Sequence, residues 1–165
     1  MSSRLLKGLA AAAALVVLTA APAAAQSFTL TAKLSGSGEA TPIAAGVVTG
    51  AFGDATIVVN MTTRTVTYTV NVWNLPSGVI ASHIHVGAEG VGGPVVVNFT
   101  VPAQASNDFS FTGSVADTAF VLRPDQGIRS ADDMFQAILG GNSYVNVHSA
   151  VNPGGEIRGQ LVLKQ

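Results

Sequence analysis

The residue pattern with the clearest chemical meaning is a pair of histidines, His83 and His85, in the segment SHIHVGAEGVGGP. The chain has one further histidine, His148, in the segment YVNVHSAVNPGGEIRG, and both segments run directly into glycine-rich turns. On a β-strand, residues i and i+2 point to the same face with Cα atoms roughly 6.5–7 Å apart. Two imidazoles at that separation can converge on one ion, so the spacing predicts a copper or zinc site. His148 completes a set of three nitrogen ligands if its strand lies beside the first.

Glu156 is a candidate for the same site, either as a fourth ligand or as an acceptor that orients an imidazole. Its alternative role is an ion pair with Arg158 or an exposed charge. The histidines also have a structural alternative, in which they hydrogen-bond to Thr, Asn or loop carbonyls and pack the loops. Arg158 would then bridge Glu156 or Glu39 and backbone carbonyls, within a structural motif of Glu39, Asn152, Pro153, Gly154, Gly155, Glu156 and Arg158.

Strands must position these side chains, because apolar and polar residues alternate around each histidine. The apolar set of the three segments is Ile84, Val86, Val145, Val147, Ile157, Leu161 and Leu163, and the opposite set is His83, His85, Tyr144, Asn146, His148, Glu156, Arg158 and Gln160. A core takes the aliphatic face, so all three histidines are predicted on the polar face.

The same alternation predicts about nine short strands separated by Gly, Pro and Asn turns, which is typical of an antiparallel sandwich or barrel. The predicted strands cover residues 28–34, 46–52, 55–60, 65–75, 80–86, 94–99, 108–115, 143–149 and 156–163. The segment SADDMFQAILGG predicts one short connecting helix, with Ser130 and Asp133 at its start and Gly140 at its end. Trp73, the sole tryptophan, falls on the polar side of its strand, where it is either covered by a loop or forms a contact platform.

Residues 1–25 have the features of a secretory signal peptide: Arg4 and Lys7, an apolar run, and Ala23–Ala25 before a cleavage site at about Gln26. We therefore expect a secreted or periplasmic protein with a single domain at 26–165. No later apolar run approaches membrane-spanning length. Without Arg4 and Lys7, six Lys and Arg residues stand against nine Asp and Glu, a net charge of −3 that argues against a nucleic-acid partner. The chain has no cysteine, so no disulfide supports the fold.

Catalytic motifs are weak. The segment GAEGVGG is not followed by the Gly-Lys-Ser/Thr of a phosphate-binding loop, and no G-x-S-x-G nucleophile motif occurs. These observations disfavour an enzyme without deciding the question.

The segments HIHVGAEGVGGPVVV and YVNVHSAVNPGGEIRGQL resemble the CHRD domain, a family named after chordin and common in secreted bacterial proteins. Ser149 replaces the usual Thr, and LSGSGEATPIAAGVVTGAF is similar to the family's opening, with Glu39 and Pro42 in matching places. The resemblance implies an all-β, antiparallel Greek-key β-sandwich, immunoglobulin-like or superoxide-dismutase-like. The histidines also look similar to those of copper–zinc superoxide dismutase, but that enzyme needs more histidine ligands and a disulfide.

The resemblance and the residues together predict an exported CHRD-type binding or surface-associated module without catalytic activity. Its partner would be a protein or a surface ligand that the sequence does not identify. The alternative is a copper- or zinc-binding protein that uses His83, His85 and His148 on the sheet face.

Overall fold

The computed structural model describes residues 26–39 and 46–164, so the predicted signal peptide and Pro42 lie outside the described residues. The strands are β1 (Ser27–Ser35), β2 (Phe52–Asn60), β3 (Thr65–Leu75), β4 (Val79–Val86), β5 (Val95–Asn98), β6 (Asn107–Ala116), β7 (Ser143–Ser149), β8 (Ile157–Gln160) and β9 (Val162–Leu163). The helical elements are α1 (Ala131–Leu139) and three 3-10 turns, η1 (Gly36–Gly38), η2 (Asp117–Ala119) and η3 (Pro124–Gln126).

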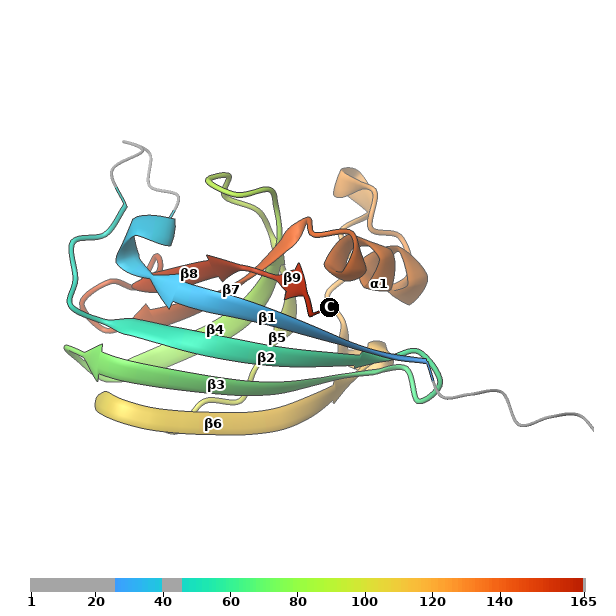
Figure 1. Cartoon of the computed structure of the whole chain (residues 1–165). Helices are drawn as coiled ribbons and strands as arrows, with labels where there is room; N and C mark the ends of the chain where they lie inside the picture. The colour runs from blue at the N-terminus through green and yellow to red at the C-terminus, as the bar shows by residue number, and fades with distance from the viewer. Residues whose placement is uncertain (1–25, 40–45, 165) are drawn as a thin grey trace, which may run out of the picture.

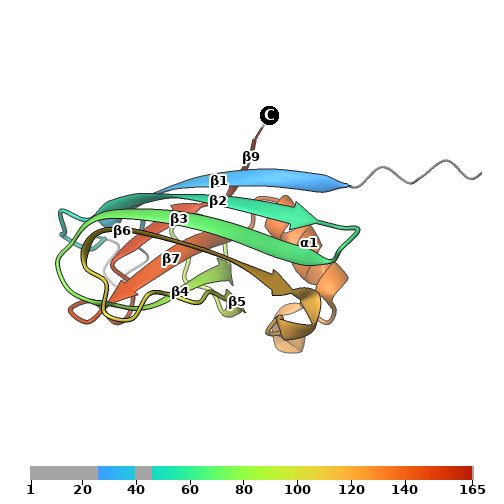
Figure 2. The ribbon, with the colours of Figure 1, turned by 90° about the horizontal axis from the view of Figure 1, so that it is seen from below.

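The described strands form one antiparallel sheet in the order β5-β4-β7-β8-β1-β2-β3-β6, with β9 paired to β1. The sheet bends over on itself, so that β4, β5 and β7 lie behind β1, β2 and β3 (Figures 1 and 2). The prediction of an all-β, antiparallel fold with one helix is confirmed. The finer assignment to an immunoglobulin-like or superoxide-dismutase-like Greek-key sandwich stays a prediction.

The core lies between the two halves of the bent sheet. Leu30, Ile57 and Val70 from one half and Ile84 and Val145 from the other have no exposed surface. These are the positions that strand alternation assigns to the core, and each buried aliphatic side chain contributes roughly 1.5–3 kcal/mol. The opposite face of these strands is thereby left mainly for polar side chains.

Helix α1 begins and ends where the sequence predicts. The Ser130 side chain accepts a hydrogen bond from the Asp133 amide, and the Asp133 carboxylate accepts one from the Ser130 amide, which forms a capping box. Gly141 takes a left-handed conformation (φ 78°) just after the helix. Met134, Phe135 and Ile138 are fully buried, so the helix closes one end of the core. Among the described residues, no helix has the length and apolar character needed to cross a membrane.

Two predicted strands are wrong in detail. Residues 46–51 form no strand, because the pairing of β1 with β2 ends at Ser35 and Phe52 and offers this segment no partner strand. Among the described residues, its backbone contact with the chain after β1 is a single hydrogen bond from the Val47 amide to Gly36 O, at 2.8 Å. The segment 156–163 is not one strand but is divided at the buried Leu161 into β8 and β9. Strand alternation predicts Leu163 on the apolar side, but it lies beyond this break and is 45% exposed. The reason is that β8 pairs with β7, whereas β9 pairs with β1.

Candidate metal centre

The three histidines come together because β4 and β7 are neighbouring antiparallel strands. His83 lies opposite Asn146, His85 lies opposite Tyr144, and His148 lies opposite Ala81, one diagonal step from His83. One ligand nitrogen from each imidazole lies within 4.8 Å of the others. The convergence predicted from strand parity is therefore present in the structure.

Two of the imidazoles are fixed by the glycine-rich turns that follow them. His85 Nδ1 donates to Gly93 O at 2.9 Å, and His148 Nδ1 donates to Pro153 O at 3.0 Å. A carbonyl oxygen only accepts, so each Nδ1 carries the proton and each Nε2 keeps its lone pair. Metal-binding histidines are commonly held by this kind of backbone contact.

The free nitrogens of the cluster point at one another. His148 Nε2 is 3.2 Å from His83 Nδ1, and His85 Nε2 is buried without any hydrogen-bond partner. His85 and His148 are each 8% exposed, whereas His83 is half-buried. The polar face at this point is thus covered by the turns rather than open to water, and it contains an unsatisfied acceptor at its centre.

The environment favours neutral imidazoles, the form that binds metals. Burial, followed by the neighbouring His148 and His85, lowers the pKa of His83 to about 4. Burial also lowers the pKa of His85 and of His148, against the raising effect of their backbone hydrogen bonds. All three rings are therefore uncharged at neutral pH.

A layer of side chains on β7 and β8 supports the turn at residues 87–94. The Tyr144 ring stacks on His85 at 4.8 Å between centroids, and the Tyr144 hydroxyl accepts from Gly93 N at 3.0 Å. Arg158 places its guanidinium carbon 3.3 Å from the Tyr144 ring centre and donates to Ala88 O at 2.8 Å. Gln160 donates to Gly87 O at 2.9 Å. Tyr144 and Gln160 lie on the same strand face as the predicted site residues, and this alternation in the sequence is what identifies them.

Glu156 does not join the three-histidine group. Its carboxylate is completely buried and accepts hydrogen bonds from Ser149 Oγ at 2.7 Å and from Asn152 Nδ2. Burial opposes ionisation, but hydrogen bonds from neighbouring hydroxyl and amide groups outweigh it and lower the pKa of the carboxyl. Glu156 thus fixes the Asn152–Gly155 turn that carries Pro153, the residue whose carbonyl orients His148.

Glu39 and Arg158 border a polar pocket of about 370 Å³ beside His85, which Asn146 and Gly154 also line. Asn146 Nδ2 donates to Glu39 Oε2 at 3.3 Å, and burial raises the pKa of Glu39 to about 7. The predicted bridge from Arg158 is wrong for the carboxylates, since the guanidinium lies within ion-pair distance of neither Glu156 nor Glu39, but its predicted contact with a backbone carbonyl is present. Arg158 instead packs on Tyr144 of the neighbouring strand β7 and donates to Ala88 O.

The fold and the cluster define an all-β domain with a buried three-histidine site on the outer face of its sheet. The family model of the CHRD domain matches residues 30–161. This match spans most of the 165 residues, so the chain belongs to the CHRD domain family. No curated protein and no solved structure gives a significant match.

The lowered pKa of His83 predicts a pH dependence of stability for the metal-free protein. An unfolded histidine titrates near 6.5, whereas folded His83 titrates near 4. Between these values the unfolded chain binds a proton that the folded chain does not, so the unfolding free energy falls as the pH falls from about 6.5 toward 4. The slope is at most about 1.4 kcal/mol per pH unit and is reduced by the partial solvent exposure of His83.

The measurement is urea unfolding in EDTA at pH 7.5, 6.5, 5.5 and 4.5 for wild type and His83→Gln. We expect the difference in stability between the two proteins to change across this range, in favour of His83→Gln at low pH. Comparison with this variant cancels the opposite contribution of Glu39, whose raised pKa favours the folded state at lower pH. If the unfolding free energies of the two proteins change in parallel with pH, the lowered pKa of His83 is contradicted.

Proposed function

We propose that this chain is an exported, non-catalytic member of the CHRD family that binds one copper or zinc ion through His83, His85 and His148. Export is supported by the signal-peptide features of residues 1–25. The metal-binding assignment is supported by the convergence of the three histidines.

The buried His85 Nε2 has no hydrogen-bond partner and faces the nitrogens of two other neutral imidazoles within 4.8 Å. A buried acceptor without a partner costs roughly 1–3 kcal/mol. A cation held by the three lone pairs removes that cost. A site used only for packing needs the two carbonyl contacts and does not explain why His85 Nε2 is buried without a donor among the described residues.

Imidazole nitrogens suit zinc and copper better than the hard ions Mg²⁺ and Ca²⁺. Three protein ligands leave one position of a four-coordinate ion for water or another small ligand. The polar pocket beside His85 supplies space for such a ligand. In the metal-free protein, His83 donates from Nδ1 to His148 Nε2, and ion binding replaces this hydrogen bond.

The proposal of a non-catalytic role rests on the surroundings of the histidines. Among the described residues, the hydrogen-bond partners of the three rings are one another and the carbonyls of Gly93 and Pro153. No serine hydroxyl lies within hydrogen-bond distance of a histidine there, so the described residues offer no histidine-activated serine. Storage or delivery of the metal fits this arrangement, since three protein ligands leave one position open for exchange.

Calorimetric titration of EDTA-treated protein with Zn²⁺ and with Cu²⁺ tests the proposal. We expect one equivalent to bind and the melting temperature to rise, since an ion at 100 times its Kd stabilises the folded state by about 2.7 kcal/mol. Mg²⁺ serves as the control and is expected to do neither. A melting temperature that changes with neither Zn²⁺, Cu²⁺ nor EDTA would overturn the proposal.

A further inference from the structure

The outer face of β1, β2, β3 and β6 carries one row of four threonines in register. Thr31 pairs with Thr56, Thr56 with Thr69, and Thr69 with Thr112, which makes one row across four strands. All four threonines are exposed. Neighbouring strands are about 4.8 Å apart, so the four threonines of this row are evenly spaced across the sheet.

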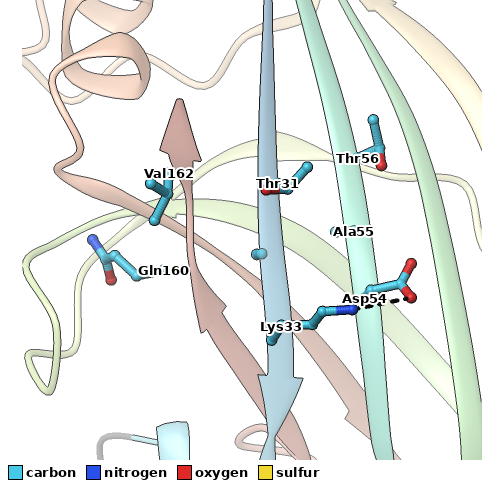
Figure 3. A pocket seen from close by; sticks show the side chains of 8 residues that line it. Thr31, Lys33, Asp54, Ala55, Thr56, Gln160 and Val162 are labelled. Atoms are coloured by element: carbon cyan, nitrogen blue, oxygen red, sulfur yellow. Dashed lines mark ion pairs between the residues drawn. The ribbon is translucent and has the colours of Figure 1, made fainter. Parts of the chain in front are cut away.

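A cavity of about 590 Å³ opens on this face between β2 and the β8–β9 break. Thr31, Lys33, Asp54 and Thr56 line it from β1 and β2, and Gln160 and Val162 line it from the other side of β1 (Figure 3). Pockets for small organic ligands have volumes of roughly 300–1,000 Å³. None of the three histidines lines this cavity, whose polar lining consists of hydroxyl, amide and paired charged groups.

An aromatic pair borders the same face. Phe52 and Trp73 lie directly opposite each other on β2 and β3, with ring centroids 5.3 Å apart and an angle of 21° between the rings. Phe52 is 48% exposed and Trp73 is partly exposed, so no loop covers them completely. Their strand positions are two residues beyond Asp54 and Asn71, one row from the cavity.

The charges of the cavity cancel. Lys33 Nζ is 3.8 Å from Asp54 Oδ2, and Asn71 Nδ2 donates to Asp54 Oδ1 at 2.8 Å. The one lysine and the one aspartate that line the cavity therefore face each other, and neither sign of charge is in excess. An uncharged ligand with many hydroxyl groups complements such a surface better than an ionic one.

We propose that this face binds a neutral polysaccharide chain, with one sugar ring on the Phe52–Trp73 pair and further sugars in the cavity. Sugar rings present C–H groups that pack on aromatic faces and hydroxyls that both donate and accept hydrogen bonds. The exposed hydroxyls of Thr31 and Thr56, which line the cavity, offer partners of both kinds. The inference uses none of the three histidines and is independent of the proposed metal site.

The test is affinity electrophoresis of the metal-free, signal-peptide-cleaved protein in gels that contain hydroxyethylcellulose, barley β-glucan or galactomannan. We expect at least one of these neutral polymers to retard the protein and to change the fluorescence of Trp73, the sole tryptophan. Thr56→Val removes one hydroxyl at constant shape, and we expect it to weaken binding about fivefold, the scale of one hydrogen bond. Trp73→Ala should weaken it more.

Thr118→Val is the matched control, because Thr118 is an exposed threonine in η2 outside the threonine row, and this variant should bind as wild type does. Circular dichroism checks that each variant folds. Retardation by none of the three neutral polymers, or by polygalacturonate alone, would overturn the proposal. So would equal binding by Thr56→Val and wild type, or polysaccharide binding that appears only after Zn²⁺ or Cu²⁺ is added.

Discussion

Replacement of His148 by alanine is expected to lower the affinity for Cu²⁺ or Zn²⁺ by more than about 100-fold. Removal of a hydrogen-bond partner of a ligand typically costs about 10–100-fold, and loss of the ligand itself costs more. His148 supplies one of the three converging nitrogens and is the only one contributed by β7. Calorimetric titration of variant and wild type measures the loss.

His148 also donates to Pro153 O, so its replacement affects the turn as well as the site. His83→Ala separates the two effects, because the His83 ring hydrogen-bonds to His148 rather than to a turn carbonyl and is only half-buried. We expect His83→Ala to keep the circular dichroism spectrum and to lose metal binding to a similar extent. Wild-type affinity in both variants would show that the histidines do not hold the ion.

Replacement of Arg158 by alanine is expected to produce the largest loss of stability among substitutions of charged residues. The side chain is 2% exposed, donates to Ala88 O and lies on the Tyr144 ring. A hydrogen bond from a charged group contributes about 1.5–3 kcal/mol, and a desolvated cation–π contact adds up to about 2 kcal/mol. We expect the melting temperature to fall by roughly 5–10 °C.

Arg129→Ala is the matched control, since Arg129 is exposed just before α1, and its melting temperature should stay within about 2 °C of wild type. Arg158 also fixes the 87–94 turn through Ala88, and this turn holds His85 through Gly93. Metal affinity should therefore fall along with stability in Arg158→Ala. An unchanged melting temperature would contradict the structural role of the guanidinium.

Strand parity is the part of the site that the sequence predicts well. A strand has only two faces, so the aliphatic residues Ile84 and Val145 in the core leave His83, His85 and His148 on the other face. Strand parity does not predict that β4 and β7 are neighbouring strands. The family resemblance does not state it either, and it follows from the register His83↔Asn146 in the folded chain.

The burial of the histidines is less predictable, because it depends on turns and not on strands. Parity predicts a polar face and normally implies a solvated one. Here the turns after β4 and β7 fold back over the rings, and their carbonyls at Gly93 and Pro153 accept the Nδ1 protons. Turn conformation depends on contacts such as Tyr144 with Gly93, which join residues 51 positions apart.

The errors in the fold have the same origin. The segment at 46–52 has the composition of a strand, but no strand remains for it to pair with once Ser35 has met Phe52. The expected ion pair of Glu156 with Arg158 rests on closeness in sequence. In the structure Glu156 binds Ser149 and Asn152, whereas Arg158 lies across from Asn146 and reaches Tyr144.

Location of the metal by anomalous X-ray diffraction from crystals grown with Zn²⁺ tests the central claim most directly. The proposed function predicts one strong anomalous peak between the three rings, with His83, His85 and His148 nitrogens at about 2.0–2.1 Å from it. A fully occupied peak elsewhere, or none at this position when Zn²⁺ is in excess, would contradict the account.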